Sequence, residues 1–159
     1  MAVRIDTLIY ILDEKNKKVL LIHKKRGFGK EYINAPGGKC EEGETPEECA
    51  IRECFEEVNI TPKMLEWAGL LEFLNNDGED VIYCHVFVSK DWEGEIKESD
   101  EAIPKWYKFD EIPYEKMWPE DKIWLPKILK GKKILGRFRF IDWKFVEGSE
   151  EIYEIRLLR

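Results

Sequence analysis

The segment from residue 38 to residue 60 constrains the fold more than any other part of the sequence, because it predicts a helix with defined ends. Thr45 is typical of a helix N-cap, and Pro46 suits the first helical position. Glu48 follows Thr45 by three residues, which is the spacing of a capping box. We therefore predict a helix over residues 46–58, directly after a glycine turn.

Three carboxylates share one face of this predicted helix. Glu53, Glu56 and Glu57 lie three and four residues apart, and residues at these spacings are neighbours on a helix surface. Like charges four residues apart cost about 0.2–0.5 kcal/mol per pair, and Arg52 alone does not neutralise the group. The carboxylates by themselves fit a solvated acidic helix as well as a site that holds Mg²⁺ against phosphates. The opposite, packed stripe is predicted to contain Ala50, Cys54 and Val58.

The complete spacing of this segment resembles the Nudix box, G-x5-E-x7-R-E-U-x-E-E-x-G-U, in which U is an aliphatic residue. Its defined polar positions and first glycine are matched by Gly38, Glu44, Arg52, Glu53, Glu56 and Glu57. Cys54 stands at an aliphatic position and Asn59 at a glycine, and both departures are mild. The chain is identified as a member of the Nudix hydrolase superfamily. The resemblance implies an α/β fold, an α/β/α sandwich around a mixed β-sheet, as a single domain over residues 1–159.

Composition narrows the class of partner. The net charge is −7 and no run of basic residues indicates a nucleic-acid footprint, so a polymeric nucleic-acid substrate is disfavoured. No apolar run approaches transmembrane length, and residues 1–6 lack the pattern of a signal peptide, so we expect a cytoplasmic protein without a membrane partner. The four cysteines show no CxxC spacing, which favours reduced, mostly buried thiols over a zinc site.

Short apolar runs separated by turns predict a mixed sheet outside the box. Turns at residues 13–16 and 75–78 predict hairpins between the strands on either side of them. A second helix is predicted over residues 121–129, although Pro126 should kink it or mark a new start. Strands are predicted at residues 5–12, 19–24, 65–74, 81–88, 102–109, 134–143 and 152–158, the last two as a terminal hairpin.

Similarity to one branch of the superfamily covers nearly the whole chain. It is carried by KKRGFG at residues 24–29, ESDE at 98–101, MWPED at 117–121 and GRFRF at 136–140. This branch is that of the MutT-related oxidised purine nucleoside triphosphate hydrolases of the human type. Such enzymes convert damaged purine triphosphates to monophosphates and pyrophosphate. The resemblance therefore implies nucleotide-pool sanitation, with a small-molecule nucleotide as the substrate.

The resemblance also implies a metal site and a catalytic base. Mg²⁺, with Mn²⁺ as the alternative cation, would be held by Glu53, Glu56, Glu57, the Gly38 carbonyl and Glu101. Arg52 would orient the helix carboxylates through charge-assisted hydrogen bonds, and Glu44 would brace the loop before the helix. Either Glu57 or Glu101 would activate the water that attacks the β-phosphorus.

Base recognition is implied outside the box. The residues expected to contact the nucleotide are Thr7, Lys24, Phe28, Asn34, Phe73, Trp118, Glu120 and Asp121, with Lys24 on a phosphate and Thr7 at the pocket floor. Trp118 can stack on a purine, and Asn34 can offer both a donor and an acceptor. One of two adjacent carboxyls is expected to stay protonated and to donate a hydrogen bond. Taken alone, Glu120 and Asp121 would more often be acidic residues that favour a helix start.

Three functions are compatible with these residues. The first is hydrolysis of oxidised purine triphosphates, and the second is a Nudix pyrophosphatase for another substrate, such as an ordinary triphosphate, a methylated purine nucleotide or ADP-ribose. The third is a Nudix domain that binds without turnover, which the intact set of helix carboxylates disfavours. The human-type branch carries two aspartates where this chain has Glu120-Asp121, so the preferred damaged base stays open. A monomer is expected.

Overall fold

The computed structural model describes residues 2–30 and 32–156. The longer strands are β1 (Ala2–Asp13), β2 (Lys18–Lys24), β6 (Glu66–Asn75), β7 (Asp80–Ser89), β9 (Ala102–Lys108), β10 (Lys133–Ile141) and β12 (Glu151–Ile155). The short strands are β3 (Ile33–Asn34), β4 (Gly37–Lys39), β5 (Thr61–Lys63), β8 (Asp91–Glu93) and β11 (Lys144–Phe145). The helices are α1 (Pro46–Val58), the 3-10 turn η1 (Tyr114–Lys116) and α2 (Asp121–Leu129). Among these residues, neither α1 nor α2 has the length and apolar character needed to cross a membrane.

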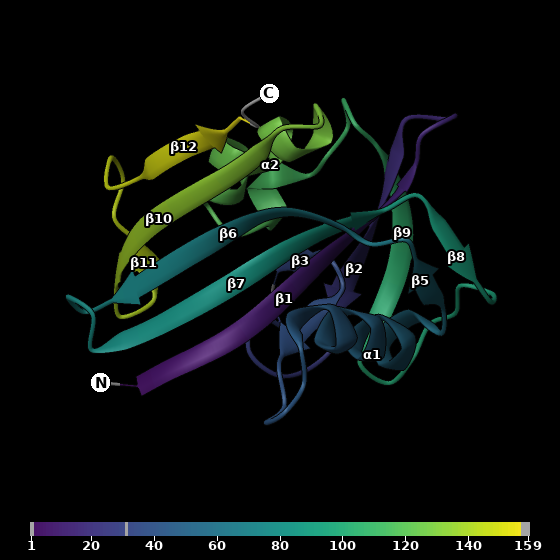
Figure 1. The fold of residues 1–159 in the computed structure, drawn as a ribbon, viewed down its shortest axis with the longest axis horizontal. Coiled ribbons are helices and arrows are strands. Elements are labelled where there is room, and N and C mark those ends of the chain that lie inside the picture. The colour runs from purple at the N-terminus through teal and green to yellow at the C-terminus, as the bar shows by residue number, and fades with distance from the viewer. Residues whose placement is uncertain (1, 31, 157–159) are drawn as a thin grey trace.

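A ten-stranded mixed sheet forms the framework of the molecule (Figure 1). Its main path runs β11-β10-β6-β7-β1-β2-β3, while β12, β4 and β9 pair with β10, β1 and β2. β1 runs parallel to β7 and β10 runs parallel to β6, whereas the other pairs of this sheet are antiparallel. The predicted mixed sheet is therefore confirmed, with β5 and β8 as a separate two-stranded sheet.

The two helices cover opposite faces of this sheet. Ile9 and Ile11 of β1 belong to one buried cluster with Cys54 of α1, whereas Tyr10 belongs to a second cluster with Trp124 of α2. Successive side chains of a strand point to opposite faces, so the two clusters are the two layers of core between sheet and helices. Figure 1 shows α1 and α2 on either side of the strands. The predicted α/β/α sandwich is confirmed, as is the buried stripe of Ala50, Cys54 and Val58.

Helix α1 begins and ends as predicted. The Thr45 hydroxyl accepts the backbone N–H of Glu48 at 3.1 Å, and the Glu48 carboxylate accepts the backbone N–H of Thr45 at 2.9 Å. Pro46 is the first helical residue, and Asn59 ends the helix in the left-handed region at φ 68°. These caps satisfy backbone groups that a helix end leaves free. They also fix where the helix starts and ends, and therefore the direction in which Glu53, Glu56 and Glu57 face.

Helix α2 is continuous from Asp121 to Leu129, so the alternative in which Pro126 starts a new helix is wrong. Proline removes one backbone N–H from a helix interior and therefore weakens it. Trp124 and Leu125, on the turn that precedes the proline, are completely buried against the sheet. Tertiary packing of this face holds the helix together where local propensity would interrupt it.

The predicted hairpins are confirmed, with strands that differ at their ends. β1 and β2 pair up to Asp13 and Lys18, and β6 and β7 pair up to Asn75 and Asp80. β10 pairs antiparallel with β12 as predicted, but the short strand β11 lies between them in the chain and also pairs with β10. The strand predicted over residues 134–143 ends at Ile141 instead, because Asp142 and Trp143 turn the chain with φ of 48° and 59°. β12 ends at Ile155, and residues 157 and 158 of that prediction lie outside the described part of the chain.

Candidate active site

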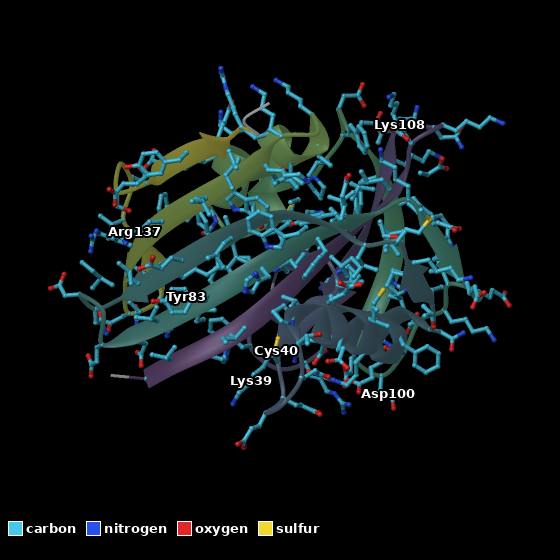
Figure 2. All side chains as sticks on the ribbon, viewed as in Figure 1. Lys39, Cys40, Tyr83, Asp100, Lys108 and Arg137 are labelled. Carbon is cyan, nitrogen blue, oxygen red and sulfur yellow. The ribbon has the colours of Figure 1, made fainter. Side chains whose placement is uncertain are left out.

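Strand β4 and helix α1 bring the predicted carboxylates to a pair of glycines. Glu57 is buried, and its Oε1 accepts the backbone N–H of Gly37 at 2.9 Å. A Cβ added at Gly38 would lie 2.7 Å from Glu53 Cδ, so the Gly38 backbone and the Glu53 carboxyl are in direct contact. Glu56 lies on the exposed side of the same helix. The chain leaves β4 beside α1, where Lys39 and Cys40 lie (Figure 2). Glycine is required at both positions because a side chain would displace either the backbone or the carboxyl.

Arg52 connects the loop to the helix carboxylates. Its Nε donates to Glu44 at 2.6 Å and its Nη2 donates to the other Glu44 oxygen at 3.0 Å. Its Nη1 donates to Glu53 at 2.9 Å and reaches Glu56 at 3.3 Å. These hydrogen bonds hold the pKa of Glu44 down at about 2, with Arg52 as the main cause. The contacts are those expected for an arginine that orients carboxylates and a glutamate that braces the loop.

The buried carboxylates fit a divalent cation. The pKa of Glu57 is raised to about 8, first because burial removes water from its carboxylate and then because Glu53 and Glu101 carry like charge. The pKa of Glu53 is also raised, with burial as the largest cause. Carboxylate and carbonyl oxygens are the ligands that Mg²⁺ prefers, and a cation would offset the repulsion among them. The donor set of this corner therefore suits a hard divalent ion.

Glu101 lies at the edge of this cluster rather than inside it. It precedes β9, its side chain is partly exposed, and its carboxylate is 3.6 Å from Arg26 Nη2. Burial is the main cause of the raised pKa of Glu53 and of Glu57, and the negative charge of Glu101 makes a smaller contribution to both. The structure thus brings the loop carboxylate near the helix carboxylates.

A cavity of about 230 Å³ adjoins the carboxylates. Gly38 and Glu57 line it, so it is continuous with the cluster just described. The residues expected to contact a nucleotide also line it, and these are Thr7, Lys24, Phe28, Asn34, Phe73, Trp118, Glu120 and Asp121. Strands β1, β2, β3 and β6, the loop after β2, the segment before α2 and the first residue of α2 supply these side chains. One pocket therefore brings Gly38 and Glu57 together with the residues expected to contact a nucleotide.

The sequence did not indicate Arg4, which lines the cavity, or Tyr32, which stacks on the wall residue Trp118 without lining the cavity itself. Tyr32 stacks on Trp118 with 4.2 Å between ring centroids, and Phe28 lies 5.4 Å from the same indole. Arg4 lies 5.8 Å from the Phe28 ring and forms an ion pair with Asp6 at 2.7 Å. Arg4 and Asp6 alternate along β1, so strand periodicity could have placed them on one face. Nothing in the sequence indicated Tyr32, because its contact with Trp118 crosses from one loop to another.

Glu120 and Asp121 are buried, with 3% of each residue exposed. Glu120 Oε1 and Asp121 Oδ2 have no hydrogen-bond partner among the described residues. Burial raises the pKa of Glu120 to about 7, and burial together with the Glu120 charge raises the pKa of Asp121 well above its usual range. Glu120 is the N-cap of α2 but makes no side-chain capping bond. A role as ordinary helix-start acids is therefore disfavoured, and the pair retains hydrogen-bonding capacity for a ligand.

The remaining polar residues of the cavity are partly committed to backbone groups. Asn34 Oδ1 accepts the N–H of Ala35 at 2.8 Å, which leaves its Nδ2 hydrogens free for a ligand. Thr7 is buried, with its hydroxyl 3.4 Å from Cys49 Sγ. Lys24 Nζ donates to a backbone oxygen of the next loop at 2.9 Å. The cavity therefore presents the Asn34 amide as a donor, the carboxyl pair of Glu120 and Asp121, and the ammonium group of Lys24 to its ligand.

Comparisons with known proteins agree with this geometry. Residues 3–128 match the family model described as the NUDIX domain. An oxidized purine nucleoside triphosphate hydrolase of Danio rerio is 38% identical over 94% of this chain and 92% of its own length. The Mus musculus protein of the same name is 38% identical over 87% of this chain and 88% of its own. A crystal structure of a MutT protein from Bacillus halodurans has a TM-score of 0.80 and 30% identity over 94% of this chain and 97% of that one.

Nudix hydrolases generally require divalent metal ions. The match over most of its length shows that this chain belongs to the Nudix hydrolase family.

Proposed function

We propose that this chain hydrolyses oxidised purine nucleoside triphosphates, such as 8-oxo-dGTP, to the monophosphate and pyrophosphate, with Mg²⁺ as its cation. One observation carries the proposal: the buried Glu120 and Asp121, each with one side-chain oxygen (Oε1 and Oδ2) that has no hydrogen-bond partner among the described residues, line the same cavity as Gly38 and Glu57. The first pair suits the edge of a base, and the second suits a phosphate chain. The names of the Danio rerio and Mus musculus relatives support the substrate class.

The cation would be held by carboxylates of α1, by a carboxylate just before β9 and by a backbone carbonyl of β4. The ligands would be Glu53, Glu56, Glu57, Glu101 and the Gly38 carbonyl, and Mn²⁺ is the alternative ion. When bound, the ion would polarise phosphoryl oxygens and lower the pKa of water. Arg52 holds the carboxylates in place through its bonds to Glu53 and Glu56. Lys24 would contact the phosphates as a point charge.

Glu57 is the proposed proton acceptor. Its Oε1 is held by the Gly37 N–H, which leaves Oε2 to accept a proton from the water that attacks the β-phosphorus. It lines the cavity, whereas Glu101 pairs with Arg26. Between the two bases that the sequence left open, this position favours Glu57.

Base recognition would combine stacking with a shared proton. A carboxyl pair that keeps one proton offers a donor and several acceptors, and the edge of a purine carries both kinds of partner. Asn34 Nδ2 adds a donor, and Trp118 and Phe28 form an aromatic wall beside the base. Each buried polar atom that stays unpaired costs about 1–3 kcal/mol, so a base that satisfies the pair is preferred over one that does not.

The test is a comparison of kcat/KM for 8-oxo-dGTP and dGTP in the presence of Mg²⁺, within a panel that includes ADP-ribose and methylated purine triphosphates. We expect a clear preference for 8-oxo-dGTP. Equal values for the two deoxyguanosine nucleotides would overturn the oxidised-base assignment. A panel without any hydrolysed compound would overturn the catalytic assignment and favour a binding domain.

The chain is also proposed to act as one domain and as a monomer. β10 lies beyond the matched residues 3–128, yet it pairs with β6 and places Phe138 in the main core. The carboxylates and the cavity come from one chain, so the site needs no second copy. Light scattering on the purified protein tests the monomer, and a cytoplasmic location, which suits a nucleotide substrate, is tested by cell fractionation.

A further inference from the structure

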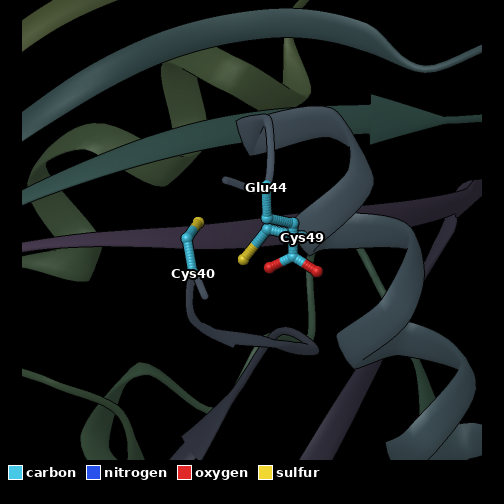
Figure 3. Close-up of side chains that lie close together, drawn as sticks. All are labelled: Cys40, Glu44 and Cys49. Carbon is cyan, nitrogen blue, oxygen red and sulfur yellow. The ribbon is translucent and has the colours of Figure 1, made fainter. Parts of the chain in front are cut away.

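Two cysteines of the Nudix segment lie together although nine positions separate them in the sequence. The sulfurs of Cys40 and Cys49 and a carboxylate oxygen of Glu44 all lie within 4.8 Å of one another (Figure 3). Cys49 is completely buried in the first turns of α1. Cys40 is partly exposed and lines a surface cleft on the outside of the loop. Cys40 is thus the more accessible of the two residues, and the sulfur of the buried Cys49 lies within 4.8 Å of the Cys40 sulfur.

The surroundings favour a sulfur–sulfur bond over a metal at this place. Both oxygens of Glu44 already accept hydrogen bonds from Arg52, at 2.6 and 3.0 Å, and one also accepts the backbone N–H of Glu41. Arg52 Nη2 lies 4.0 Å from Cys49 Sγ, so a positive charge that would repel a bound cation already lies beside this sulfur. Only two sulfurs remain as ligands, whereas structural zinc sites typically use four protein ligands.

The Cys49 thiol touches the proposed reaction centre. Its Sγ donates to the Gly38 carbonyl oxygen at 3.7 Å, and it lies 3.4 Å from the Thr7 hydroxyl. Gly38 is a proposed cation ligand, and Thr7 lies in the cavity. A change in the position of this sulfur is therefore transmitted directly to both. Cys54 and Cys84, the other two thiols, are also buried but form no such link between a solvent-accessible sulfur and the carbonyl.

We propose that Cys40 and Cys49 form a reversible disulfide in the presence of a peroxide, and that this bond lowers turnover. The Cys40 sulfur attacks one oxygen of hydrogen peroxide, which gives a sulfenic acid and one water. The Cys49 sulfur then attacks the Cys40 sulfur, and the sulfenic oxygen leaves as a second water. The two thiols lose two protons and two electrons, and the peroxide is reduced. A dithiol reductant reverses the reaction.

The disulfide removes the thiol hydrogen bond from the Gly38 carbonyl and ties the loop after β4 to the first turn of α1. Loss of partners that orient metal ligands typically lowers activity by about 10–100-fold, and we expect a reduction of about tenfold here. The formation of the bond is independent of the proposed function, whereas the fall in turnover rests on it. The cysteine chemistry can therefore be tested without any substrate.

The first experiment treats the full chain with hydrogen peroxide and follows its thiols and its mass. We expect the number of free thiols under denaturing conditions to fall from four to two. The intact mass should fall by about 2 Da, and a peptide map should join residues 40 and 49. A dithiol should restore all four thiols. Unchanged thiols, a bond between other cysteines, or a gain of oxygen without a disulfide would overturn the proposal.

The second experiment measures turnover of the best triphosphate before and after peroxide. Cys40→Ser should keep its turnover after treatment, whereas Cys54→Ala, which also removes one thiol, should lose as much as the wild type and regain it with a dithiol. Thermal melting of each variant verifies that it is folded. A disulfide that leaves wild-type turnover unchanged would overturn the switch. It would also be overturned if Cys40→Ser lost as much turnover after peroxide treatment as the wild type. If no substrate is hydrolysed, the thiol count and the mass still decide the bond.

Discussion

Glu57 on α1 and Asp121 on α2 are both buried carboxyls, with 2% and 3% of the residue exposed, but their polar atoms are satisfied differently. Glu57 Oε1 accepts the Gly37 N–H, whereas Asp121 Oδ2 has no partner within residues 2–30 and 32–156. Burial raises the pKa of each carboxyl. A carboxyl that the backbone holds in one orientation suits a repeated proton transfer, and one that retains free hydrogen-bonding capacity suits recognition of a ligand. The comparison separates the chemistry of the site from its specificity.

The largest expected effect follows from removing the proposed base. Glu57→Gln keeps the size of the side chain but cannot accept a proton, so kcat should fall by about 10²–10⁴-fold. Steady-state hydrolysis of the best triphosphate with Mg²⁺ measures it. Glu47→Gln is the matched control, because Glu47 is an exposed carboxylate in the first turn of the same helix. A greater loss of kcat in Glu101→Gln than in Glu57→Gln would transfer the role of base to Glu101.

The next effect concerns the stability of the fold, to which the carboxyl pair of Glu120 and Asp121 makes a pH-dependent contribution. The pKa of Glu120 is raised to about 7 in the folded protein, from an ordinary value near 4.5, because burial disfavours its charge. A raised folded pKa contributes stability that is complete below about pH 4.5 and is lost as the pH rises through 7. The loss for this group is about 3 kcal/mol. Asp121 changes stability in the same direction.

Urea unfolding between pH 5 and pH 8, with a chelator present, measures this dependence. Glu57 also has a raised pKa and adds a dependence of the same sign, so the informative quantity is the difference between wild type and Glu120→Gln. The variant should gain stability relative to the wild type as the pH rises. A difference that stays constant over this range would show that Glu120 carries no raised pKa.

A third effect concerns the selection of the nucleobase of the substrate. Asp121→Asn removes the titratable carboxyl and puts an amide donor in place of one of its oxygens, and a buried hydrogen bond left unmade costs about 1–3 kcal/mol. We expect the ratio of kcat/KM for 8-oxo-dGTP over dGTP to fall by about 10–100-fold. The two substrates serve as controls for one another. An equal decrease for both would show that Asp121 supports the fold of the cavity without selecting its ligand.

How far the sequence predicts each region depends on how local its signals are. The ends of α1 follow from Thr45, Glu48 and Asn59, which act within one helical turn, so the helix and the spacing of its carboxylates could be predicted. The proximity of Glu57 to the Gly37 N–H follows from a β4–α1 loop of fixed length. Pro126 is the counterexample. Proline usually interrupts a helix, but α2 continues through Pro126 because its buried residues pack against the sheet.

The recognition region depends on contacts between distant segments. Motif similarity brought Trp118, Glu120 and Asp121 to attention, but it carried no information on Tyr32 or on Arg4, which reach the aromatic wall from other elements. Burial of the carboxyl pair, which sets its pKa, depends on the packing of α2 against the sheet. Such quantities are properties of the folded chain and are absent from any short window of sequence.

The smallest expected effect tests the position at which this chain departs from the human-type pattern. Glu120→Asp shortens the side chain by one methylene and restores two adjacent aspartates, while the number of carboxyls in the pair stays the same. One methylene in a binding pocket changes discrimination by about 1 kcal/mol or more, so the preference between 8-oxo-dGTP and an oxidised dATP should shift by about fivefold. Competition between the two substrates in one reaction measures the ratio directly. Because Glu120 is buried and its Oε1 is unpartnered among the described residues, the shorter side chain moves a group that the ligand itself must satisfy. An unchanged ratio would mean that Glu120 does not select between the two damaged nucleobases, and that Asp121 is the one carboxyl of the pair that contacts the nucleobase.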